Sequence, residues 1–134
     1  MIFKIFGIYL SVSWLFLCMI CFAIFSGKIL AFSLCFFALI LHELGHIFMT
    51  YFLDEKINIF YILPFGFCCR LKNQSKIKKD KMIKILLAGP VTSFIVSGLF
   101  LFWTREFSLV NLVIGFFNLL PFGMLDGGRL IRKI

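Results

Sequence analysis

The residues with the clearest chemical potential lie together at His42, Glu43 and His46. In an α-helix, residues four apart lie one above the other on the same face, so the two imidazoles can converge on one metal ion. Glu43 projects about 100° away on the same turn, close enough to act on a bound water without being a ligand. This arrangement is typical of a zinc hydrolase, which usually has three protein ligands and one position open to water. The motif supplies two ligands and a base, so a third ligand must come from elsewhere.

The alternative for this motif is that two histidines and a glutamate pack or hydrogen-bond between helices. The surrounding sequence favours a metal site. Glu43 is the only charged residue between Lys28 and Asp54, and an ionisable residue inside an apolar span is costly and functional by default. The chain contains two histidines, and both fall at this spacing.

Asp126 is the candidate third ligand. It follows Pro121, which we expect to end a helix, and it precedes two glycines that permit close approach of the backbone. The segments that carry His46 and Asp126 both run toward the same side of the membrane, so the two residues should meet at one depth. The alternative for Asp126 is a helix-end carboxylate at the membrane surface, paired with Arg129.

The elements that must position these residues are apolar segments. The 134 residues are 62% hydrophobic and 15% charged, whereas soluble domains are about half apolar and a quarter charged. A transmembrane helix needs about 20 apolar residues. By that measure, three uncharged runs predict spans over residues 5–27, 85–104 and 107–125. A fourth span is predicted over residues 29–53, where Glu43 is the only charge.

A shorter uncharged segment, residues 57–69, contains Pro64 and Gly66 and is too short to cross the bilayer. We expect a strand pair or a re-entrant loop near residues 57–71, covered by protein if it enters the bilayer. The prediction is therefore an all-α membrane protein with about four transmembrane helices. It forms a single polytopic domain over residues 1–134.

The basic residues are distributed unequally between the two sides of this topology. Two of the 14, Lys28 and Arg105, fall on one side, and the other twelve lie near the termini and in or beside the basic loop at residues 70–84. This asymmetry places both termini and the loop in the cytoplasm. The net charge of +8 thus reflects topology and contact with lipid headgroups, and we expect no nucleic-acid partner.

In its motifs the sequence resembles the site-2 protease family of intramembrane zinc metalloproteases, peptidase family M50. The resemblance covers roughly residues 30–130 and is closest to the bacterial branch of stage IV sporulation protease FB. Four motifs carry it: HELGH at residues 42–46, LPFG at 63–66, AGP at 88–90 and NLLPFGMLDGG at 118–128. The chain departs from the family pattern at Phe67, at Thr92 and Ser93 after AGP, and at Met124.

The resemblance implies a multi-pass enzyme of the bacterial cytoplasmic membrane that binds one Zn²⁺ per chain. It would hydrolyse a peptide bond in or near a transmembrane segment of a membrane-tethered protein, under the control of membrane-protein regulators. It implies the zinc ligands His42, His46 and Asp126 and the catalytic base Glu43. It also implies that Pro64, Phe65 and Gly66 help bind an extended substrate, and that Asn118 supports the site.

Two other functions remain open at this point. The first is a catalytically silent relative that binds zinc and a partner without cleavage, an expectation that follows from the chain ending eight residues after Asp126. The second is a small structural membrane protein whose motif is accidental. Zinc content separates the second from the rest, and cleavage of a transmembrane substrate separates an enzyme from a silent relative.

The topology predicts which residues are accessible from each side. In a cysteine-free background, cysteines placed at Ser75 and Asp80 should react with a membrane-impermeant thiol reagent only from the cytoplasmic side, because the basic loop stays there. A cysteine at Lys28 is the control and should react only from the far side. Labelling of Ser75→Cys exclusively from outside would contradict the topology.

Overall fold

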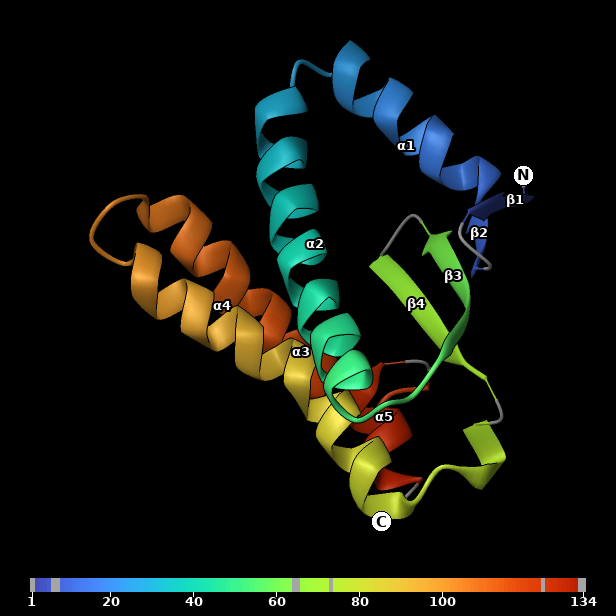
Figure 1. Ribbon diagram of the computed structural model, residues 1–134. Helices are drawn as coiled ribbons and strands as arrows, with labels where there is room; N and C mark the ends of the chain where they lie inside the picture. The colour runs from blue at the N-terminus through green and yellow to red at the C-terminus, as the bar shows by residue number, and fades with distance from the viewer. Residues whose placement is uncertain (1, 6–7, 64–65, 73, 124, 133–134) are drawn as a thin grey trace.

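The computed structural model describes residues 2–5, 8–63, 66–72, 74–123 and 125–132. In chain order its elements are β1 (Ile2–Ile5), β2 (Ile8–Val12), α1 (Trp14–Phe25), α2 (Ile29–Phe52), β3 (Ile57–Leu63), β4 (Gly66–Leu71), a 3₁₀ turn η1 (Gln74–Lys76), α3 (Lys79–Phe100), α4 (Arg105–Leu119) and α5 (Asp126–Ile131). Figure 1 shows α2 crossing beside an α3–α4 hairpin, with the strands on its other side.

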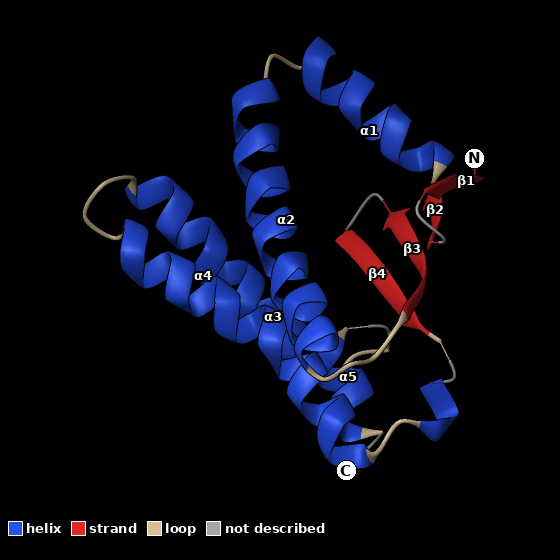
Figure 2. Cartoon of the chain, viewed as in Figure 1, coloured by secondary structure: helices blue, strands red, loops and turns tan. Residues whose placement is uncertain are grey.

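The expected strand pair near residues 57–71 is present as β3 and β4. It belongs to a four-stranded sheet of order β1-β2-β3-β4 (Figure 2). β2 and β3 are parallel, with Leu10 opposite Phe60, and the other two neighbouring pairs are antiparallel. The pairing leaves β4 at one edge of the sheet, on the side that faces α2.

The first predicted span, residues 5–27, is wrong as a single helix, and the all-α prediction needs the same correction. Ile2–Ile5 and Ile8–Val12 form β1 and β2, and α1 begins only at Trp14. A charge-free run shows that a segment is apolar but does not distinguish a strand from a helix. The stretch from Ile2 to Val12 is rich in isoleucine and aromatic residues that favour strands, and β2 completes its hydrogen bonds on β3.

Two helices of the described residues are long and apolar enough to cross a bilayer, α2 with 24 residues and α3 with 22. At 1.5 Å per residue they extend about 36 Å and 33 Å, against a hydrocarbon core of about 30 Å. α1 has 12 residues and α4 has 15. α3 begins at Lys79, ahead of the predicted residue 85, because its first turns carry charges that a charge-free window excludes.

The helix ends near Pro121 agree with the sequence prediction. Leu120 is extended (φ −61°, ψ 143°) and ends α4, because the residue before a proline is driven away from helical geometry. The chain then folds back, so that α5 packs against α3 and α4. Gly127 lies directly on this turn, where a Cβ would stand 2.7 Å from the Leu120 carbonyl oxygen and closer still to that of Leu119. Only glycine allows α5 to start here.

A small hydrophobic core lies where α2 ends and α3 begins. Leu71, Met82, Ile85 and Leu86 are buried there, with Leu130 of α5 packed against them. Elsewhere many large apolar side chains are exposed, including Phe25, Phe102 and Trp103 at 85% or more. Exposed apolar surface of this extent is unusual for a soluble monomer, and it suits contact with lipid.

Candidate metal centre

His42 and His46 lie one turn apart on the buried face of α2. Their side chains converge as the sequence spacing predicts, with the two Nε2 atoms 3.3 Å apart. Both residues are almost fully buried, at 1% and 7% exposure. The inner face of α2 therefore presents two ring nitrogens to one point in the protein interior.

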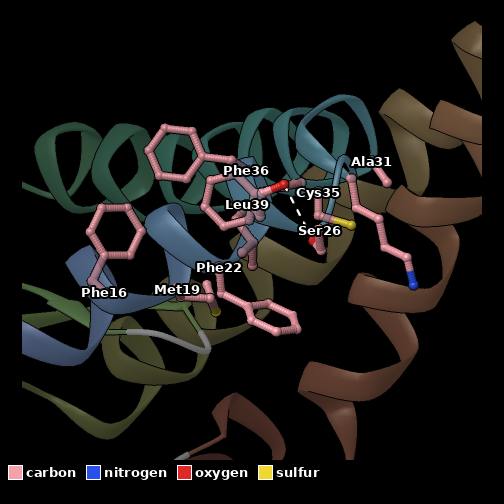
Figure 3. Close-up of a pocket in the computed structure, with 11 residues that line it drawn as sticks. Phe16, Met19, Phe22, Ser26, Ala31, Cys35, Phe36 and Leu39 are labelled. Atoms are coloured by element: carbon pink, nitrogen blue, oxygen red, sulfur yellow. Dashed lines mark hydrogen bonds between the residues drawn. The ribbon is translucent and has the colours of Figure 1, made fainter.

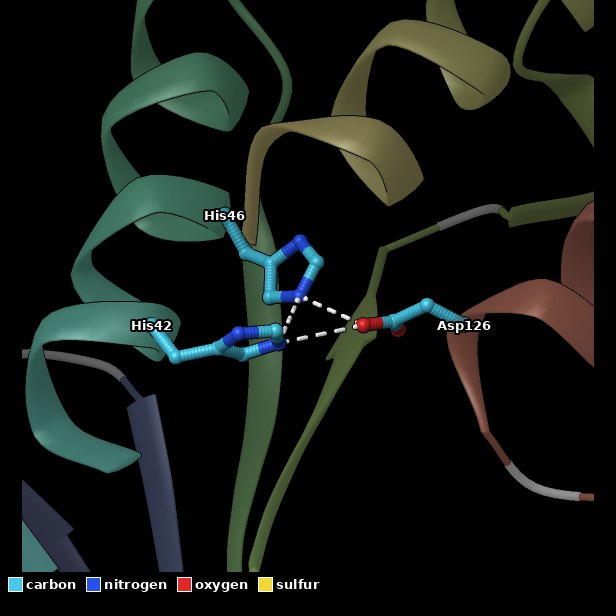
Figure 4. Close-up of side chains that lie close together, drawn as sticks. All are labelled: His42, His46 and Asp126. Carbon is cyan, nitrogen blue, oxygen red and sulfur yellow. Dashed lines mark hydrogen bonds and ion pairs between the residues drawn. The ribbon is translucent and has the colours of Figure 1, made fainter. Parts of the chain in front are cut away.

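Asp126 meets this pair from the first residue of α5. Its Oδ2 lies 3.2 Å from His42 Nε2 and 3.0 Å from His46 Nε2 (Figure 4). The residue is 8% exposed. The alternative of a surface carboxylate paired with Arg129 does not fit, because the ion pairs of Asp126 within the described residues are with the two histidines. Residues 80 positions apart in sequence thus form one cluster.

The outer nitrogens of both rings are occupied. His46 Nδ1 donates to the carbonyl oxygen of Ile85 at 2.7 Å, and His42 Nδ1 lies 2.8 Å from Ser93 Oγ. A carbonyl oxygen can only accept, so a neutral His46 carries its proton on Nδ1 and a lone pair on Nε2. Second contacts of this kind fix the tautomer and the ring orientation of metal-binding histidines. The Ser93 hydroxyl holds the His42 ring in the same way, and it can accept a hydrogen bond when His42 carries its proton on Nδ1.

The charge state of Asp126 follows from its neighbours. Burial raises the pKa of this carboxyl, but hydrogen bonding and charge interactions with His42 and His46 lower it by more, so the pKa lies well below its usual range. The carboxyl is therefore ionised at neutral pH and presents acceptor oxygens. The two Nε2 atoms and the carboxylate oxygen face one another, so the cluster needs positive charge between its members: protons on the rings supply it without a metal, and a metal cation would replace those protons.

The spacing of the three atoms fits zinc. Tetrahedral ligands at about 2.0–2.2 Å from the ion lie about 3.3–3.6 Å from one another. The observed separations of 3.0, 3.2 and 3.3 Å are slightly shorter. In the part of the chain that the structure describes, these three residues are the group of metal-ligating side chains whose donor atoms lie within 4.8 Å of one another. Two imidazoles and one carboxylate are a donor set that zinc accepts in hydrolases.

Gly89 of α3 closes one side of the cluster. A Cβ built on this glycine would lie 2.6 Å from His42 Nε2 and closer still to His46 Nε2. With any other residue at position 89, the backbone of α3 could not approach the two Nε2 atoms this closely. The sequence gave no chemical role to Gly89. It gave no role to Ser93 or to the Ile85 carbonyl, since no local pattern shows which turn of α3 lies against α2.

Some of the other predicted site residues are described by the structure, and the rest lie outside the described residues. Glu43 is buried at 8% exposure, on α2 beside His42 but outside the three-residue cluster. Asn118 is half-buried on α4, and its Nδ2 donates to the Ile114 carbonyl one turn back. Gly66 begins β4, opposite Leu63. Pro64, Phe65 and Met124 lie outside the described residues.

A family model and two curated relatives match this chain. Residues 29–106 match Peptidase family M50. The chain is 35% identical to a zinc metalloprotease of Methanocaldococcus jannaschii, across 77% of this chain and 33% of that protein. It is 29% identical to Stage IV sporulation protein FB of Bacillus subtilis, across 73% of this chain and 38% of that protein. The chain thus spans about a third of the length of these relatives.

A solved structure agrees with the sequence matches. The chain superimposes on the Site-2 Protease from Methanocaldococcus jannaschii with a TM-score of 0.78 and 33% sequence identity. The similarity covers 97% of this chain and 68% of that one.

The close approach of α3 to the cluster predicts that a methyl group added at Gly89 prevents zinc binding. Gly89→Ala should reduce zinc from about one ion per chain toward zero, because the added Cβ occupies the space beside both Nε2 atoms. Gly98→Ala on the same helix is the matched control, since no atom lies within 4 Å of its Cβ. It should keep full zinc and a slightly more stable helix, by about 0.5–1 kcal/mol. Metal analysis of the purified variants with circular dichroism distinguishes loss of zinc from loss of fold, and full zinc in Gly89→Ala would contradict the arrangement.

Proposed function

The chain belongs to peptidase family M50, and from that premise we propose that it is an intramembrane zinc metalloendopeptidase. Membership of the family supports a zinc-dependent metallopeptidase. The cleavage of a peptide bond in or near a transmembrane segment of a membrane-tethered protein is our proposal for its reaction. The observation that carries the proposal is the convergence of three buried acceptor atoms, with a carboxylate at the next position along α2.

In this proposal His42, His46 and Asp126 hold one Zn²⁺, and Glu43 is the catalytic base. A bound zinc ion would supply Lewis acidity toward the scissile carbonyl and toward water. The Glu43 carboxylate accepts a proton from the water molecule while the water oxygen attacks the carbonyl carbon of the substrate. The same group then delivers that proton to the amide nitrogen as the carbon–nitrogen bond breaks. His42 and His46 keep their orientation throughout, because Ser93 and the Ile85 carbonyl occupy their outer nitrogens.

Substrate binding is proposed to use the sheet. A peptide bond inside a helix is shielded by the hydrogen bonds of that helix, so the substrate must become extended before cleavage. β4 is an edge strand on the side of α2, and an edge strand can hold an extended peptide by main-chain hydrogen bonds. We assign the segment Pro64, Phe65 and Gly66 to substrate binding and Asn118 to support of the site.

The membrane topology is part of the same proposal. Four spans, with both termini and the basic loop on the cytoplasmic side of a bacterial membrane, agree with the charge asymmetry. α2 and α3 are long enough to cross. α1 and α4 are shorter and would cross by local thinning of the bilayer or by snorkelling of flanking residues. Control by other membrane proteins belongs to this proposal too.

Replacement of the proposed base separates chemistry from metal binding. Glu43→Gln should keep about one zinc per chain while hydrolysis of a transmembrane reporter falls by about 10²–10⁴-fold, because the amide cannot accept the proton. Metal analysis and the cleavage assay are run on the same preparation. A parent protein that binds zinc and cleaves no transmembrane substrate would favour the catalytically silent alternative. Undiminished cleavage by Glu43→Gln would contradict the role of this residue.

Changes at Asp126 test the third ligand. Asp126→Ala should lower both zinc occupancy and hydrolysis, because two imidazoles leave the ion short of its usual protein ligands. Asp126→Asn keeps an oxygen without the charge, so zinc should fall partly while hydrolysis falls steeply. Arg129→Ala is the control three residues along α5 and should keep near-normal zinc. Full zinc occupancy in Asp126→Ala would exclude Asp126 as a ligand.

A further inference from the structure

A cavity lies between α1 and α2 and shares no residue with the metal centre. Its volume is about 350 Å³. The walls are apolar, with Phe16, Met19 and Phe22 from α1 and Phe32, Phe36 and Leu39 from α2 (Figure 3). At the turn between the two helices the lining changes to Ser26 and Lys28. The cavity is therefore a long apolar space with a cation at one end.

The dimensions of the cavity select its occupant. Its lining runs from Phe16 to Ser26 on α1 and from Lys28 to Leu39 on α2, a length of about 15 Å at 1.5 Å per residue. The empty space between the walls, with its open side included, is about 880 Å³, which over this length gives a mean cross-section of about 60 Å². A helix about 10–12 Å in diameter needs about 80–110 Å². A single extended methylene chain, about 4–5 Å across from carbon contact distances, needs about 15–20 Å².

The chemistry at the turn selects the headgroup. Lys28 is the one charged residue of the lining, and a lysine can lay its methylene stem along an apolar wall while its ammonium reaches the interface. The Ser26 hydroxyl donates to the Ala23 carbonyl at 3.3 Å, so its oxygen is left as an acceptor. No acidic residue is among those that line the cavity. The local charge therefore favours an anion.

We propose that this cavity binds one acyl chain of an anionic phospholipid, with the headgroup phosphate at Lys28. The proposal goes beyond hydrolysis and rests on the membrane embedding of the chain. Phe16 meets Phe32 and Phe36 at ring-centroid distances of 6.5 and 5.7 Å at the far end from the turn. The acyl chain fills the space between this aromatic cluster and Lys28, and it holds α1 against α2.

Lipid retention by the full chain tests the headgroup assignment without any measurement of activity. The purified protein is titrated with phosphatidylglycerol and phosphatidylcholine of identical acyl chains, and bound lipids are counted by native mass spectrometry. The parent should retain one phosphatidylglycerol with about fivefold preference, the effect expected for one lysine near the phosphate. Lys28→Gln should lose this preference. Arg105→Gln, which removes the other basic residue predicted on that side, should retain it.

Filling the cavity tests the acyl chain assignment. Ala31→Trp places a ring in the cavity and should abolish retention of both lipids. Val113→Trp, at a position on α4 that is 63% exposed, is the control and should bind lipid as the parent does. Zinc content shows that each variant is folded. Equal retention of the two lipids by the parent, or unchanged retention in Ala31→Trp, would overturn the proposal. A dimer that Ala31→Trp dissociates and phosphatidylglycerol does not affect would overturn it too, in favour of a second copy.

Discussion

The need to satisfy three electron-rich atoms in an apolar interior governs the centre of this structure. Two imidazole nitrogens and a carboxylate oxygen lie 3.0–3.3 Å apart, and in an interior of low dielectric constant such a cluster is costly without positive charge between its members. The histidines cannot turn away, because the Ile85 carbonyl and the Ser93 hydroxyl hold their outer nitrogens. The cluster is thus preorganised toward a metal ion, and the fold has to supply that arrangement from three separate helices.

Each helix meets this demand in a different way. α2 provides two ligands through the helical repeat alone. α3 approaches closely enough to fix both imidazoles, and Gly89 is the residue that permits this approach. α5 brings in the carboxylate after the break at Pro121, and its position depends on Gly127 packing against the carbonyl oxygens of the preceding turn. Small residues at these contacts are required because helices in lipid associate through close packing instead of a hydrophobic driving force.

The sheet and α1 form a part of the structure that is separate from the metal centre. The sheet and α1 lie beside α2 without contributing an atom to the three-residue cluster. The sheet offers an edge strand near the helix that carries the histidines, and α1 encloses an apolar cavity with that same helix. α2 therefore lies between the metal centre on one side and the edge strand and the apolar cavity on the other.

The sequence by itself determined the chemistry that depends on local geometry. The spacing of His42 and His46 fixes their common face in any α-helix, and Pro121 ends α4 through its own ring. The apolar runs located α2 and most of α3, which are the two helices of the described residues that are long and apolar enough to cross a bilayer. None of these inferences requires knowledge of a distant residue.

Only the tertiary structure decided the remainder. The pairing of Asp126 with the histidines instead of Arg129, the contacts of Ser93 and Ile85, and the space occupied by Gly89 all depend on which turn of one helix lies against another. Residues 2–5 and 8–12 show the same limit, since absence of charge does not distinguish a helix from a strand, and pairing along β3 completes the hydrogen bonds of β2. Local sequence carries the preferences of the backbone over a few residues, whereas these contacts join segments that are 39 to 84 positions apart.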